Sequence, residues 1–288
     1  AGFSSAVAGA IPMLARLKVA MISTGVGAFV VAFGSLVALL KSAATVGADF
    51  QQALSGLEAI SGATADEMGV MSTQARELGA STAYTAIQVV ELQTELAKLG
   101  FSTKGITDST PAILDLASAL DVDLANAAML AGSTVRAFGL ETEDTQRVVD
   151  VLSLSASSVA LDFESLKESF KNVAPAARAV GVSVEQTAAL LGVLANAGVK
   201  GSRGGTQLST AFIELNSKGL TLDQALEKIS TSSNKLGTAM ALAGKTGGTA
   251  LVTLANETPQ IAELTKQFEN AEGAARAMAE IKLDNLAG

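Results

Sequence analysis

Residues 194–208 read LANAGVKGSRGGTQL. Gly198, Gly201, Gly204 and Gly205 stand here with two basic residues, between two stretches whose apolar spacing is typical of helices. Glycine and basic residues before a helix are a common way to bind phosphate. Glycine is also the usual residue where one helix ends and the chain turns into the next. The stretch therefore indicates either a nucleotide-binding loop or a helix stop with a turn.

The phosphate-loop motif is absent from this stretch. It requires G-x-x-x-x-G-K-[ST] after a strand. Counted from Gly198 or from Gly201, the sixth residue is not glycine, and the preceding LLGVLANA has the composition of a helix. We therefore predict that Gly198 ends a helix in the left-handed conformation. We also predict that Gly204 and Gly205 allow a tight reversal with close backbone approach. An anion site at the next helix start stays open as the alternative.

The side chains of the turn complete this hypothesis. We expect Lys200 and Arg203 to remain in solvent or to meet helix carbonyls, so that neither is needed for folding. The candidate site is a structural turn rather than a catalytic or cofactor site, and it comprises Gly198, Gly201, Ser202, Gly204, Gly205 and Thr206.

Helix caps and glycine stops recur along the chain and predict short helices with short connections. Two prolines are taken as boundaries, one opening a helix at Thr110-Pro111 and one ending a helix near Pro175. The remaining predicted helices are residues 65–79, 86–99, 124–138, 143–158, 184–197, 206–216, 221–229, 233–242 and 258–279. Leu96–Phe101 resembles Leu194–Val199, and 119–124 resembles 179–184, but these pairs share no period.

Composition agrees with an all-α fold. The chain has 288 residues, 49% of them hydrophobic but only 4% aromatic, with no Trp. Alanine and leucine supply most apolar residues, and both favour helices, whereas sheets are usually richer in β-branched and aromatic residues. We predict a multi-helix bundle of short antiparallel helices with an apolar N-terminal helix.

Several kinds of chemistry are excluded by composition. The chain has no Cys and no His, which rules out the usual zinc sites and a Ser-His-Asp triad. A net charge of −8 argues against specific nucleic-acid binding. Asp121 and Asp123 have calcium-loop spacing, but the Gly and closing Glu of that motif are missing. We predict no catalytic, cofactor or metal residues, and hence no enzyme.

Residues 19–40, VAMISTGVGAFVVAFGSLVALL, carry no charge over about 22 residues, which is long enough for a helix to span a bilayer. Small residues at four-residue spacing favour close helix packing. The segment is interpreted as membrane-capable, with a helix buried in an oligomer as the alternative. Its marked positions are Val19, Gly27, Phe29, Phe33, Gly34 and Leu40. The expected divisions are 1–41, an apolar segment, 42–217, a helical core, and 218–288, a helical extension.

Three runs now carry a resemblance to a known family. They are GADFQQALSGLEAISGAT (47–64), ARELGASTAYTAIQVVELQTELAKLGFS (75–102) and NVAPAARAVGVSVEQTAALLGVLANAGVKGSRGGTQLSTAF (172–212). Together they resemble the core of phage tail tape measure proteins. The third run is the specific part. Gly204 stands where the family usually has Ala, and Glu91 where it often has a small residue.

The resemblance implies a virion structural protein. Such a protein lies in the tail lumen, sets tail length by templating the tube, and assists genome ejection. The implied partners are further copies of the chain, as a trimer or hexamer, tail tube and tail tip or baseplate proteins, and tail assembly chaperones. The implied locations are the virion, the host cytoplasm during assembly and the host inner membrane on ejection. The alternative function is a membrane-associated or secreted helical pore-forming protein.

Overall fold

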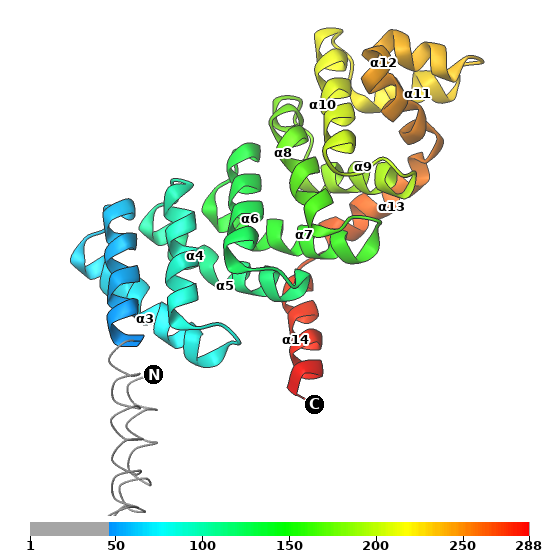
Figure 1. The fold of residues 1–288 in the computed structure, drawn as a ribbon. Coiled ribbons are helices and arrows are strands. Elements are labelled where there is room, and N and C mark those ends of the chain that lie inside the picture. Colours follow the sequence, from blue (N-terminus) through cyan, green and yellow to red (C-terminus); the bar gives the residue numbers. More distant parts are fainter. Residues whose placement is uncertain (1–45, 288) are drawn as a thin grey trace, which may run out of the picture. The chain divides into compact units, whose positions relative to one another are not determined.

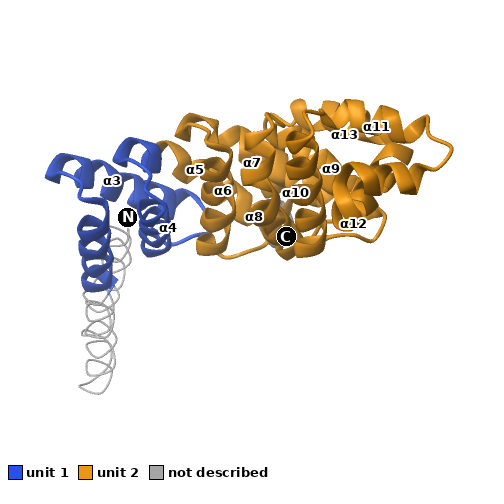
Figure 2. Ribbon diagram, turned by 90° about the horizontal axis from the view of Figure 1, so that it is seen from above, with its two compact units in different colours: residues 1–107 blue, residues 108–288 orange. Residues whose placement is uncertain are grey.

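The computed structural model describes residues 46–287. The chain divides into two compact units, residues 1–107 and 108–288 (Figure 2). The division falls inside the helix that spans residues 103–120. The predicted apolar segment, residues 19–40, lies outside the described residues, so its membrane-capable character stays a prediction. Within the described part of the chain, no helix is both long enough and apolar enough to cross a membrane.

Helices are the sole regular secondary structure of the described residues, which confirms the all-α class (Figure 1). Residues 46–61 form the first described helix. The helices that follow are α3 Ala65–Ser81, α4 Ala86–Lys98, α5 Thr103–Leu120, α6 Leu124–Phe138, η1 Thr142–Asp144, α7 Thr145–Ser158, α8 Phe163–Ala179, α9 Val184–Asn196, α10 Gly201–Ser217, α11 Leu222–Ser230, α12 Lys235–Asn256, α13 Thr258–Glu269 and α14 Ala274–Ala287.

One kind of helix end recurs at the connections. A residue with positive φ is followed by an apolar residue whose N–H donates to the carbonyl five residues earlier, as in the Schellman motif. Glycine holds the positive-φ position in the pairs Gly100-Phe101, Gly139-Leu140, Gly181-Val182, Gly198-Val199 and Gly219-Leu220. Asp121 does so at φ 57, before Val122, although it carries a Cβ.

In the first unit, hydrogen bonds of side chains connect the starts of two helices. Thr64 and Glu67 form the predicted capping box at the start of α3, and Glu67 also accepts a hydrogen bond from Thr103. The Thr103 hydroxyl is the first cause of the lowered pKa of Glu67. These bonds tie the start of α3 to the start of α5.

The prediction that a helix begins at Thr110-Pro111 is wrong. Helix α5 starts at Thr103 and continues through Pro111. A proline inside a helix cannot donate to the carbonyl four residues earlier, which here belongs to Thr107. That carbonyl instead accepts a hydrogen bond from Gln74 Nε2 of α3 at 2.8 Å. A side chain distant in sequence thus replaces the missing bond.

The second predicted proline boundary is also wrong. Helix α8 continues past Pro175 to Ala179. Pro175 and Lys171, the residue whose carbonyl loses its helical partner, are both on the exposed side of α8. Water can bond to a carbonyl there, so the proline does not end the helix.

The second unit is built from stacked helical hairpins. Helices α6, α8 and α10 begin at residues 124, 163 and 201, at regular intervals of about 39 residues. They pack in order, α6 on α8 and α8 on α10, while α7 packs on α9 beside them. Stacking of similar hairpins buries a continuous core between neighbours. The similar segments noted within the sequence share no period and did not reveal this spacing of the helices.

The chain then turns back along the stack. Helix α12 packs on α10, α13 on α9 and α14 on α7. The predicted single helix from 258 to 279 is wrong, because Gly273, at φ 78, separates α13 from α14. The predicted stop at Leu242 is a kink within α12, since Ala243 and Gly244 have non-helical angles.

Candidate functional site

The glycine-rich stretch connects α9 to α10. Gly198 has φ 81, and the N–H of Val199 donates to the Leu194 carbonyl at 2.8 Å. The predicted helix stop at Gly198 is therefore confirmed. Helix α10 begins at Gly201 rather than at Thr206.

Gly204 and Gly205 lie in the first turn of α10, so the predicted tight reversal at these residues is wrong. Their predicted close backbone approach is confirmed. A Cβ added at Gly205 would lie 2.4 Å from the carbonyl oxygen of Ser169 and 2.8 Å from its Cα. A Cβ added at Gly204 would lie 2.8 Å from the Val199 carbonyl oxygen. Helix α8 thus occupies the space that a larger residue at 205 would need.

Polar side chains of α8 fix the same contact. The Ser169 hydroxyl donates to the Gly201 carbonyl at 2.9 Å. Asn172 Nδ2 donates to the Ser202 hydroxyl at 3.2 Å and to the Glu168 carbonyl at 2.7 Å. The residues of α8 that receive the glycines were not singled out from the sequence, because α8 and α10 meet only in the tertiary structure.

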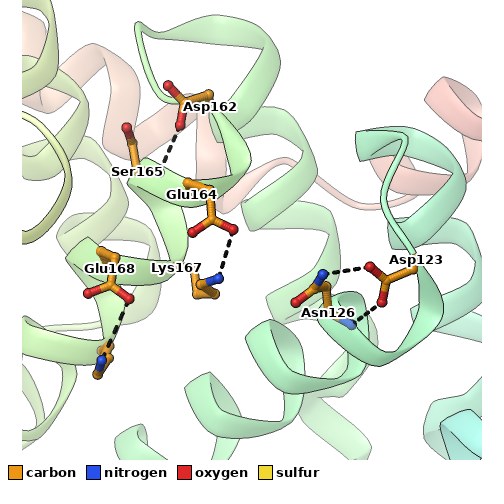
Figure 3. Close-up of polar contacts among 8 residues, drawn as sticks. Asp123, Asn126, Asp162, Glu164, Ser165, Lys167 and Glu168 are labelled. Atoms are coloured by element: carbon orange, nitrogen blue, oxygen red, sulfur yellow. Dashed lines mark hydrogen bonds and ion pairs between the residues drawn. The ribbon is translucent and has the colours of Figure 1, made fainter.

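The basic residues of the turn do not converge on a ligand position. Lys200 Nζ lies 3.3 Å from Asp162 Oδ2, while Arg203 is exposed. Asp162 is the N-cap of α8 and accepts from the Ser165 N–H (Figure 3). That backbone hydrogen bond is the main cause of the lowered pKa of Asp162, and Lys200 adds to it. The pair joins the starts of α8 and α10 at the surface.

Thr206, the last residue of the candidate turn, is exposed. Its carbonyl accepts from the Thr210 hydroxyl one turn later, at 2.9 Å. Thr206 is thus an outward-facing residue of α10, whereas the two glycines before it are buried against α8.

The structure reveals a second copy of this arrangement. Residues 201–210, GSRGGTQLST, and 244–253, GKTGGTALVT, share the pattern G-x-x-G-G-T-x-L-x-T. The first glycine has φ 63 in one copy and φ 65 in the other. The leucines, Leu208 and Leu251, are both completely buried. The doubled Gly-Gly-Thr is visible in the sequence and was the signal that could have shown the equivalence.

The second copy packs α12 against α10. A Cβ added at Gly247 would lie 2.8 Å from the Ala211 nitrogen and 2.9 Å from its Cα. A Cβ added at Gly248 would lie 2.8 Å from Cα of Met240, in the preceding part of α12. Helix α10 therefore packs on α8 through its own Gly205, and α12 packs on α10 through Gly247.

A lysine supports the chain break in the second copy. Lys218 Nζ, just beyond the end of α10, donates to the carbonyls of Ala241 and Leu242 at 2.7 and 2.6 Å. These carbonyls end the first half of α12, where the kink removes their helical partners. The ammonium group thus caps the half-helix before Gly244.

The other acidic candidates have local structural roles. Asp123 caps α6 by accepting from the Asn126 N–H at 2.8 Å (Figure 3). Asp121 occupies a left-handed turn position. In residues 46–287, no group of three or more acidic side chains is arranged to hold a metal ion.

These features define a class of protein, a helical structural module whose glycines serve packing between helices. Comparison with known proteins is specific. A family model described as phage-related minor tail protein matches residues 72–281. The chain belongs to this family.

Two relatives carry more detailed names. The chain is 33% identical over 270 residues to the tape measure protein of Pneumococcus phage Dp-1, in a match that covers 84% of this chain and 24% of that protein. It is 31% identical over 276 residues to the probable tape measure protein of Escherichia phage P2, covering 84% of this chain and 34% of that protein. The chain thus spans about a quarter to a third of the length of these relatives.

Proposed function

We propose that this chain acts as the folded module of a phage tail tape measure protein. The observation that carries the proposal is the match over 84% of the chain to the tape measure protein of phage Dp-1. The proposed place is the tail lumen, where the protein would set tail length during tube assembly and assist genome ejection. Its role is structural rather than enzymatic.

The fold supports an assembly role. At Gly205 and Gly247 neighbouring helices approach so closely that an added Cβ would meet backbone atoms, so a larger residue at either position would disturb the stack. Its proposed partners are further copies of the chain, as a trimer or hexamer, with tail tube, tail tip or baseplate and chaperone proteins. An acidic surface does not hold passing DNA, which agrees with a lumen through which the genome leaves.

Purified tails test the proposal. Quantitative immunoblotting against the tube protein should give three or six copies of this chain per tail. Lengthening the gene in frame should lengthen tails in electron micrographs. Absence of the chain from purified tails would overturn the proposal.

The pore-forming alternative makes the opposite prediction. It requires the chain to fractionate with membranes of cells that produce no phage particles. The family match favours the tail role, and no described helix favours the alternative. Insertion of residues 19–40 into the host membrane is a separate proposal, tested by carbonate extraction of infected-cell membranes.

A further inference from the structure

The start of α14 is held by a buried carboxylate of another helix. Asp150, in the middle of α7, is 2% exposed. Its Oδ2 accepts from the Gly273 N–H at 3.1 Å and its Oδ1 from the Ala275 N–H at 3.0 Å. Gln146 Nε2 also donates to Oδ2, at 3.3 Å. Asp150 therefore caps α14 from across the interface.

The described side chains of α14, as far as residue 282, bury little apolar surface. Within this stretch Ala275 and Ala279 are fully buried, and Met278 is half-buried. Helix α13 instead buries Ile261, Leu264 and Phe268. Because hydrophobic stabilisation follows the apolar area buried, residues 274–282 are held less firmly than α13.

No ion pair in the described residues joins α14 to the rest of the second unit. Arg276 Nε pairs with Glu280 Oε1 of the same helix at 3.1 Å, and both side chains are largely exposed. Hydrogen bonds from backbone N–H groups to a buried charge are stronger than neutral ones. The two bonds to Asp150 therefore fix the start of α14, while the Arg276 guanidinium is also attracted to the half-buried Asp115 of α5.

We propose that α14 is a releasable strap, latched to α7 by Asp150, that opens while the stacked helices α6 to α13 stay folded. Elements with little apolar burial open locally at lower free energy than the core. Opening would uncover the face of α7 that α14 occupies. It would also let the residues after Ala271 extend away from the stack. This inference does not rest on the proposed tape measure function.

Hydrogen exchange on the full chain, with the variant Asp150→Asn, tests the strap. The amide keeps the shape of the carboxylate but turns a donor toward one of the two N–H groups. Backbone amides of 274–282 should exchange at least ten-fold faster, with α8 and α10 unchanged. The matched control is Asp144→Asn, which removes the same charge just before α7, where Asp144 pairs with Arg147.

A label gives an independent readout. The chain has no cysteine, so Lys282→Cys provides a single position for a spin label on the exposed side of α14. Label mobility should rise in Asp150→Asn and stay unchanged in Asp144→Asn. The inference is overturned if α14 exchanges alike in both variants, or if Asp150→Asn accelerates exchange in every helix together.

Discussion

The two glycine decapeptides, residues 201–210 and 244–253, differ in what comes before them. The first follows a complete Schellman turn, which separates α9 from α10. The second follows Ala243 and begins with Gly244, and these two residues only kink α12 without ending it. Both nevertheless bring a glycine of the next helical turn against a neighbouring backbone. The contact with the neighbouring helix is made by the fifth residue of the first copy, Gly205, and by the fourth residue of the second, Gly247, so the shared pattern is packed differently where the chain turns and where it kinks.

The polar support of the two copies also differs. The first is held by neutral groups of α8, with Ser169 donating to the Gly201 carbonyl. The second is held by the charged Lys218. The donors therefore differ in charge and in what they bond, since Ser169 bonds the first residue of α10 and Lys218 bonds the last carbonyls before the kink in α12.

The largest expected loss of stability comes from adding a Cβ at either of the two close contacts. Gly205→Ala should destabilise the second unit by about 3 kcal/mol, and Gly247→Ala by about 2 kcal/mol, because the added Cβ meets backbone atoms that cannot move aside. Chemical denaturation followed by circular dichroism measures both. The control is Gly69→Ala in α3, where a Cβ meets nothing within 4 Å and should stabilise by up to about 1 kcal/mol. If both substitutions left the free energy of unfolding unchanged, the claim that these glycines are needed for close helix packing would be refuted.

The left-handed glycines should behave alike. Gly201→Ala and Gly244→Ala should each cost about 1–3 kcal/mol, since an L-residue at φ near 63 to 65 is strained whatever space surrounds it. Thermal unfolding of the two variants measures this. A clear difference between them would show that the two copies are not equivalent in their local setting.

Replacing the lysine should weaken only the second copy. Lys218→Met keeps the aliphatic stem but removes the ammonium from two carbonyls, at a cost of about 1 kcal/mol. Hydrogen exchange should rise in residues 235–242 and not in α8. Lys171→Met, which removes an exposed pair with Glu168, is the matched control. Faster exchange across both copies would refute the assignment.

The smallest effect belongs to the first copy and depends on pH. The pKa of Asp162 is lowered in the folded state, so its charge stabilises the fold above the unfolded pKa, and that stability is lost as pH falls through the folded pKa. Asp162→Asn should therefore cost at most about 0.5 kcal/mol near neutral pH, since the pair is exposed. The difference from the parent chain should shrink as pH falls below the ordinary carboxyl pKa of about 3.9 and through the lowered folded pKa. Lys200→Ala with Arg203→Ala should likewise leave folding intact.

Local signals in the sequence predicted most helix limits correctly. The capping box at Thr64 and the glycine at Gly139 each act within a few residues, so their patterns suffice. Pro259 opens α13 as predicted, but Pro111 does not open a helix, because α5 already runs through it and the freed Thr107 carbonyl is bonded by Gln74, 33 positions away. The helix stop at Gly198 was located correctly, but the start of α10 at Gly201 and the packing of Gly205 on Ser169 were not.

The sequence alone determined the helical class, the glycine stop at Gly198 and the resemblance to a tail protein family. These depend on local backbone preference, periodicity and residue order. The tertiary structure alone decided that Gly205 packs on α8, that Gly247 packs on α10 and that Asp150 holds α14. Such contacts depend on which helix faces meet, and no local pattern specifies that.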